Sequence, residues 1–197
     1  MLIGDIHQRI HPRPAVRRFD ASMDGARHES AHAVCCYACG GVVRKMVFEQ
    51  HGAALCMIAE LGDCWRRSIV DAAGPMADRL FKHRRDGRSV ITIDHENCAR
   101  AILEIYPAED SEMAMSAAEN AAAEIIRKNE DALHAVAKEF YNSPDGQLLQ
   151  GEIEEILGRY PLPGPPRDPP VTPGWKRILS RAGEPRSFTR TDGFAPA

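Results

Sequence analysis

The apolar positions in the first part of the chain follow helical and then strand periods. Residues 23–40 have helical spacing, and Ser22 or Asp24 can cap this helix before Gly40 ends it. Its apolar stripe consists of Ala31, Val34, Cys35 and Ala38. The segments VVRKMVF and AALCMIA then predict two strands joined as a hairpin by residues 49–52.

The second part of the sequence predicts mostly helices. Helical spacing over residues 64–83 is interrupted by Gly74-Pro75, which we expect to kink the helix. A short helix is expected from Asp94 to about residue 106, and an alanine-rich long helix over residues 109–141. Ser143-Pro144-Asp145 predicts a helix restart with a cap followed by proline, and this last helix ends near residue 158.

These elements predict a mainly α domain with a small β-hairpin over residues 23–158. Residues 1–22 are expected to be an irregular N-terminal segment. Residues 159–197 form a Pro-rich tail, which we expect to be disordered. The six cysteines have no spacing of a complete metal cluster, and we expect them to be reduced, buried small side chains.

Composition excludes several classes of function. The net charge of −3 gives no general basic field for nucleic acid. No apolar run is long enough to cross a membrane, and the N-terminal residues lack a signal-peptide core, so we expect a cytoplasmic protein. No GxxxxGK[ST] run indicates a nucleotide-driven motor.

The pentapeptide HESAH lies on the first predicted helix and has the spacing of a zinc site. His28 and His32, four residues apart, lie on the same helix face, where two imidazole nitrogens can reach one Zn²⁺. Glu29 lies beside that face, from which it can accept a proton from a water on the metal. A surface helix with two solvated histidines is the alternative that the spacing alone leaves open.

A catalytic zinc needs a third protein ligand, which must come from another element. Cys36 lies one turn beyond His32, too far along the helix from His28 to bind the same ion. The acidic residues of the following helical region remain open candidates: Glu60, Asp63, Asp71 and Asp78.

The order of the motifs resembles the peptidase domain of the FtsH-type membrane proteases. HESAHAV resembles the HEAGHA motif of that family, and a short hairpin follows in both. AAGPMADRLF resembles its GGRxAE-like segment, and ITIDHENCARAI resembles a pattern in which an aspartate opens a helix. The last predicted helices resemble the end of the family domain, so the resemblance covers about residues 24–158.

The resemblance implies that His28, His32 and Asp94 are the zinc ligands, because the aspartate that opens the helix is the third ligand in that family. His95 is the second choice, and Asp94 is equally suited to a plain N-cap role. Asp78 matches an acidic position near the family's site, and we interpret it as orienting a ligand histidine. A surface role for Asp78 stays open.

The implied fold is a zincin-like helical metallopeptidase domain, and the implied function is a zinc-dependent endopeptidase with Glu29 as general base. Ala31 and Pro75 replace a glycine and an arginine of the family pattern. The family's ATPase module and membrane anchor are missing from this sequence. We therefore expect ATP-independent cleavage of peptides or unfolded protein segments, with the oligomeric state open.

A different class of protein is the alternative: a catalytically silent, peptidase-like module that binds peptides or proteins. The Pro-rich tail carries the amphipathic segment WKRILSR, through which it could contact a separate partner. Glu29 is the residue that such a module could most easily lose, and its presence favours the enzyme.

Overall fold

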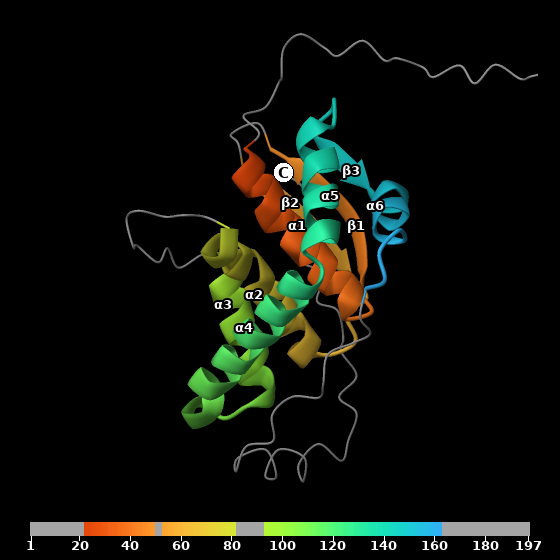
Figure 1. The fold of residues 1–197 in the computed structure, drawn as a ribbon. Coiled ribbons are helices and arrows are strands. Elements are labelled where there is room, and N and C mark those ends of the chain that lie inside the picture. The colour runs from red at the N-terminus through yellow and green to blue at the C-terminus, as the bar shows by residue number, and fades with distance from the viewer. Residues whose placement is uncertain (1–21, 50–52, 82–92, 163–197) are drawn as a thin grey trace, which may run out of the picture.

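The computed structural model describes residues 22–49, 53–81 and 93–162. The elements in chain order, shown in Figure 1, are α1 (Met23–Ala38), β1 (Val42–Phe48), β2 (Ala54–Ala59), α2 (Cys64–Phe81), α3 (Ile93–Ile105), the 3-10 turn η1 (Ala108–Asp110), α4 (Ser111–Lys128), α5 (Glu130–Asn142), β3 (Gln147–Leu149) and α6 (Gln150–Leu157). The prediction of a mainly helical fold with a small antiparallel β element is confirmed. The expectations for residues 1–21 and 163–197 lie outside the described residues.

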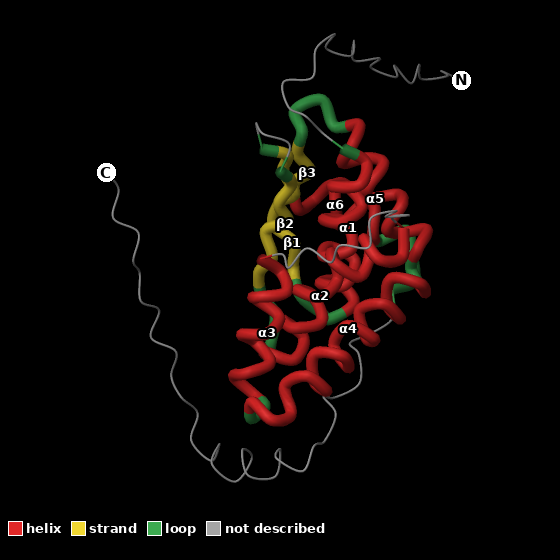
Figure 2. The backbone as a smooth tube through the Cα atoms, turned by 90° about the vertical axis from the view of Figure 1, so that its left-hand side faces the viewer, coloured by secondary structure: helices red, strands yellow, loops and turns green. Residues whose placement is uncertain are grey.

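The sheet has three antiparallel strands in the order β2-β1-β3, so the predicted hairpin is extended by one strand. Met46 of β1 pairs with Cys56 of β2 and with Leu148 of β3, and these side chains face the helices. Phe48 stacks on Phe140 of α5, with ring centroids 4.1 Å apart. Figure 2 shows the strands along one side of the molecule, with β2 at an edge of the sheet.

Helix α1 lies between the sheet and the other helices. Ser22 caps it, because its Oγ accepts a hydrogen bond of 2.9 Å from the Gly25 amide. One face of α1 packs on β1 and β2, and other faces contact α2 and α5. Its many alanines and cysteines are buried because these small side chains let neighbours approach on several sides.

Helix α2 runs without interruption from Cys64 to Phe81, so the predicted interruption at Gly74-Pro75 is wrong, whereas a kink there stays a prediction. Pro75 lacks the amide hydrogen that would bond the carbonyl of residue 71. The helix continues because it packs against α1, α3 and α4 along its length, and tertiary burial outweighs the local penalty. Helix α2 is therefore the common support of the helical layer.

The single long helix predicted over residues 109–141 is also wrong, since α4 and α5 are separated at Asn129. The backbone of Asn129 has φ −126° and ψ 31°, outside the helical region. Its side-chain amide donates to the Ile125 carbonyl at 2.7 Å, beside its own backbone amide, which donates to the same carbonyl at 3.1 Å. The break turns α5 toward the sheet, where α5 packs on α1.

Ser143-Pro144-Asp145 does not begin a helix, in contrast to the prediction. The Gln147 amide donates to the Ser143 hydroxyl at 3.1 Å, and Gly146 has a φ of 72°, which closes a turn. The chain then forms β3, which pairs with β1, and α6 begins only at Gln150. The end of α6 at Leu157, just before Gly158, agrees with the prediction.

The cysteines follow the expectation of buried small side chains only in part, since Cys56 and Cys64 are half-buried. All six cysteines are free thiols, and four are buried: Cys35, Cys36, Cys39 and Cys98. None of the helices in the described ranges is both long and apolar enough to cross a membrane.

Candidate metal centre

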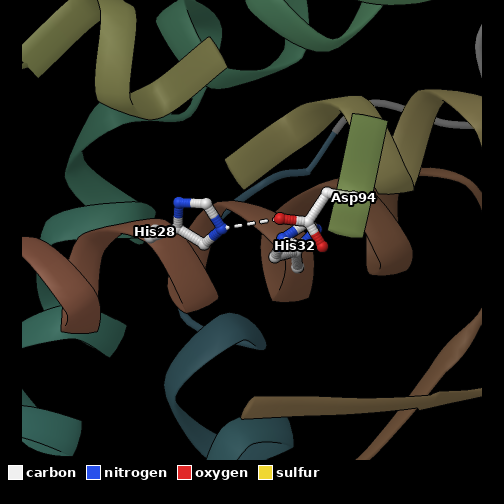
Figure 3. A group of neighbouring side chains, drawn as sticks. All are labelled: His28, His32 and Asp94. Atoms are coloured by element: carbon white, nitrogen blue, oxygen red, sulfur yellow. Dashed lines mark hydrogen bonds and ion pairs between the residues drawn. The ribbon is translucent and has the colours of Figure 1, made fainter. Parts of the chain in front are cut away.

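Helices α1 and α3 bring His28, His32 and Asp94 together at one point. Asp94 Oδ2 lies 3.1 Å from His28 Nε2, and Asp94 Oδ1 lies 3.7 Å from His32 Nε2. Figure 3 shows the carboxylate facing both imidazoles. One ligand atom from each residue lies within 4.8 Å of the others, and we call this group the His-His-Asp cluster.

The opposite nitrogen of each imidazole is held by an acceptor. His32 Nδ1 lies 2.7 Å from the carbonyl oxygen of Val70, to which it can only donate. His28 Nδ1 lies 3.2 Å from the carboxylate of Asp78. A proton on each Nδ1 leaves both Nε2 lone pairs directed at the cluster, the arrangement that metal-binding histidines usually adopt.

Gly74 leaves the space in which the two imidazoles lie. A Cβ at this position would lie 2.2 Å from His28 Nε2 and 2.4 Å from His32 Nε2, far inside van der Waals contact. Glycine inside a helix costs about 1 kcal/mol relative to alanine, and here it lets α2 approach both ligand atoms. The space for the two imidazoles therefore depends on the absence of a side chain at residue 74.

The donor set and its spacing fit a divalent cation. Zinc bonds of about 2.0 Å in a tetrahedral arrangement separate neighbouring ligand atoms by about 3.3 Å. The nitrogen–oxygen distances of 3.1 and 3.7 Å lie on either side of that value. His28, His32 and Asp94 can thus hold a metal ion.

The electrostatics of the cluster favour positive charge. Burial opposes protonation of His28, but the carboxylates of Asp78, Asp94 and Glu29 outweigh it and raise its pKa to about 9. The pKa of His32 is also raised, since Asp94 and Glu29 outweigh its burial. The imidazoles in turn hold the pKa of Asp94 well below its usual range, against the effect of burial. Protons and a metal cation therefore compete for the same site.

Glu29 lies next to the cluster, on the side of the sheet. Only 8% of the residue is exposed, and burial raises the pKa of its carboxyl, while His32 and His28 oppose this rise. The backbone amide of Cys56, in the middle of β2, favours the charged carboxylate. A buried carboxylate with a raised pKa is a stronger proton acceptor than an exposed one.

The other predicted candidates lie outside the cluster. His95 contacts Arg79 and Glu119 instead, at 3.4 and 3.8 Å. Asp71 is bound by Arg67 Nε, with both carboxylate oxygens within 3.0 Å. Asp63 caps α2 through the Arg66 amide, and Glu60 pairs with Arg44. None of these four belongs to the group that can hold a metal.

Two parts of the site were missed in the sequence. The Val70 carbonyl carries no signal in a sequence, because its role depends on the packing of α1 against α2. Gly74 did carry a signal: a glycine in the interior of a predicted helix, four residues before an aspartate, indicates a close approach. We interpreted it only as a helix interruption.

Neither a scan against protein-family models nor a search of curated proteins finds a match to this chain. We therefore interpret the site from its own geometry.

Proposed function

We propose that this protein is a zinc-dependent endopeptidase that hydrolyses peptides or unfolded protein segments. The observation that carries the proposal is the convergence of His28, His32 and Asp94 from two helices, with the buried carboxylate of Glu29 beside them. The resemblance of HESAHAV and the following segments to the FtsH-type peptidase domain supports the same reaction.

The residues divide into a metal-holding set and a proton-carrying group. Two imidazole nitrogens and one carboxylate oxygen form a donor set that suits zinc. When bound there, Zn²⁺ would supply Lewis-acid polarisation of the scissile carbonyl and acidify the attacking water. Asp78 and the Val70 carbonyl keep the histidines oriented, which frees Glu29 from any role in coordination.

Glu29 is the general base of the proposed reaction. Its carboxylate accepts the proton of the attacking water and then passes it to the leaving amide nitrogen. Because the carboxyl is buried, few water molecules compete for its charge. No second carboxylate is needed for this proton transfer.

Strand β2 is the proposed guide for the substrate. It lies at the edge of the sheet in the described part of the chain, and Cys56 at its middle adjoins Glu29. An extended peptide that adds to this edge would lie with its backbone along the catalytic carboxylate. Most backbone groups of a folded protein are already hydrogen-bonded, so strand addition favours peptides and unfolded segments.

The test measures zinc content and cleavage of casein by the full chain and by the Glu29→Gln variant. We expect the wild type to retain about one zinc per chain and to cleave casein. Glu29→Gln should retain the zinc but lose activity by about 100-fold or more, the usual contribution of a general base. Glu112→Gln, the same change at an exposed position of α4, is the matched control and should behave as the wild type.

Two outcomes would contradict the proposal. A zinc-reconstituted wild type that cleaves neither casein nor short peptides has no peptidase activity. If that protein still binds peptides, and Glu29→Gln binds them equally well, the catalytically silent binding module is the better description.

A further inference from the structure

A second site lies beside the His-His-Asp cluster, in a cavity of about 610 Å³ between β2, α2 and α3. We call it the polar pocket. The residues that matter for its chemistry are Arg67, Asp71, Asn97, Arg100 and Glu104. None of them takes part in the proposed metal binding or proton transfer.

The polar pocket adjoins the cluster, because Asp71 in its lining interacts electrostatically with His32 and Asp94. On α3, Asp94 and Asn97 are separated by three residues, so they lie on the same helix face. On α2, Gly74, Asp71 and Arg67 follow each other at intervals of three and four residues. Two turns of α2 separate Gly74 from Arg67, a distance of about 10 Å.

Strand β2 extends from Glu29 to the polar pocket. Cys56 adjoins Glu29, and residues 58–60 at the end of the strand line the polar pocket. A peptide along β2 advances about 3.3 Å per residue. A substrate side chain about three residues from the cleaved bond would therefore reach the pocket.

The carboxylates around the polar pocket already have partners. Asp71, which is only 5% exposed, binds Arg67 Nε, and Glu104 accepts a hydrogen bond of 3.0 Å from the Cys64 thiol. At the rim, Glu60 and Asp63 pair with Arg44 and Arg66.

The guanidinium groups, in contrast, retain free donors. Arg67 uses only its Nε on Asp71, so its terminal nitrogens have no partner in the described part of the chain. Arg100 lines the pocket and makes no hydrogen bond or ion pair with any described residue. Among the charged side chains that line the pocket, the unused hydrogen-bond donors thus belong to Arg67 and Arg100, and guanidinium donors suit a carboxylate.

One residue of the pocket lining, Glu60, has an unusual backbone conformation. Glu60 has a φ of 61°, a left-handed conformation that residues with a side chain rarely adopt. Glu60 follows directly after β2, and the next residues, 61–64, also line the pocket. Such conformations persist where the surrounding structure fixes them, often at binding sites.

We propose that the polar pocket is a substrate subsite that binds a carboxylate through Arg67 and Arg100. This inference rests on the proposed peptidase function. The carboxylate comes from an aspartate or glutamate side chain, or from the C-terminus of a short peptide, about three residues from the cleaved bond.

The test measures peptide binding to the zinc-loaded Glu29→Gln protein, in which cleavage is suppressed. The probes are fluorescent decapeptides of alanine, serine and leucine with blocked ends that carry a single glutamate, glutamine or lysine, scanned along the peptide. A fourth probe has no glutamate but a free C-terminal carboxylate, which distinguishes the two sources. We expect the Kd of at least one glutamate or free-carboxylate peptide to be about three- to tenfold lower than that of its glutamine counterpart.

Variants of exposed arginines locate the effect. Arg100→Gln, in the Glu29→Gln background, should abolish the preference for the carboxylate. Arg127→Gln, the same change at an exposed position of α4 outside the pocket lining, should retain it. Equal affinity for all probes, tighter binding of the lysine peptide, or a preference that survives Arg100→Gln would overturn the subsite.

Cleavage by the wild type separates this proposal from the proposed function. If the zinc-loaded wild type cleaves peptides without regard to a glutamate or a free C-terminal carboxylate, the subsite is wrong and the peptidase stands. If it cleaves nothing, the peptidase is wrong, whereas carboxylate-selective binding would still identify the pocket as a carboxylate site.

Discussion

The His-His-Asp cluster and the polar pocket share the same faces of α2 and α3 but hold their polar side chains differently. The cluster joins three helices: α1 supplies the imidazoles, α3 supplies Asp94, and α2 supplies the Val70 carbonyl. The pocket has no residue of α1 in its lining, and its Arg67–Asp71 pair lies within one helix. The polar side chains therefore converge on one point in the His-His-Asp cluster, whereas those of the polar pocket surround an open cavity.

Side-chain size at the helix interface explains the difference. Gly74 lets α2 approach the two imidazoles so closely that no methyl group fits between them. Two turns earlier on the same face, the corresponding position is Arg67, whose long side chain lines the pocket. One helix face thus borders both the proposed metal centre and the proposed substrate subsite.

The largest expected effect is that of Asp94→Asn, which removes the anionic ligand without changing size. With structural zinc binding worth about 10–16 kcal/mol over four ligands, one ligand contributes roughly 3 kcal/mol, or a hundred- to thousandfold in affinity. Glu96→Gln removes a charge from the same first turn of α3 and is the matched control. Competition with a fluorescent chelator measures both affinities, and an unchanged zinc affinity of Asp94→Asn would exclude Asp94 as a ligand.

Gly74→Ala tests whether the close approach of α2 is needed. Its methyl group would overlap both Nε2 atoms, so we expect zinc affinity to fall by about 100-fold, on the scale of strong second-shell effects. Gly151→Ala is the control, since a Cβ there has no atom within 4 Å. That variant should stabilise α6 by about 0.5–1 kcal/mol in urea unfolding and leave zinc binding unchanged. Wild-type zinc affinity in Gly74→Ala would show that the close approach of α2 is not required.

Asp78→Asn tests whether the carboxylate beside His28 strengthens metal binding by the cluster. The amide can still contact His28 Nδ1, 3.2 Å from the present carboxylate oxygen, but without the charge that makes the ring a better ligand. We expect a 10- to 100-fold loss of zinc affinity. Asp131→Asn on the exposed start of α5 should have no effect, and equal behaviour of the two variants would assign Asp78 to the surface.

The free energy of unfolding of the metal-free protein should depend on pH through the charges of the cluster. The pKa of His28 is raised from 6.5 to about 9, so its stabilising charge is fully present below pH 6.5 and is lost as pH rises through about 9. The lowered pKa of Asp94 contributes stability that is present above its ordinary value of 3.8 and lost in stronger acid. We therefore expect the chelator-treated protein to be most stable between about pH 4 and 6.5.

Between pH 6.5 and 9 the metal-free protein should lose at most about 3 kcal/mol of unfolding free energy. Zinc affinity should rise over the same interval, because a metal must displace the proton from His28. Urea unfolding with and without zinc measures both trends. A metal-free protein whose stability does not change over this interval would contradict the proposed charge state of the cluster.

The sequence predicted elements whose signal is local. The strand VVRKMVF has its predicted bounds, Ser22 caps α1, and the HESAH motif lies on a helix, because side-chain period and caps act within a few residues. The break at Asn129 depends on α5 packing against α1, and β3 on pairing with β1, so helix propensity alone predicted the wrong structure at both.

The residues of the candidate site also differ in whether a local sequence signal predicts them. His28, Glu29 and His32 follow from spacing, whereas Asp94 was reached only through a family resemblance, since no periodicity connects it to α1. The polar pocket was not foreseen, because Arg67 and Arg100 lie on different helices and meet only in the folded chain.

The smallest expected effect concerns salt, to which the two regions should respond differently. The Debye length falls from about 30 Å at 0.01 M salt to about 8 Å at 0.15 M, which weakens exposed ion pairs more than buried ones. Arg67 and Arg100 are exposed, so the preference for the glutamate peptide should fall about two- to threefold over this range. Zinc affinity, which depends on buried coordinating atoms, should change less. Peptide titrations of Glu29→Gln at both salt concentrations measure the first quantity, and a preference that salt leaves unchanged would place the carboxylate away from these arginines.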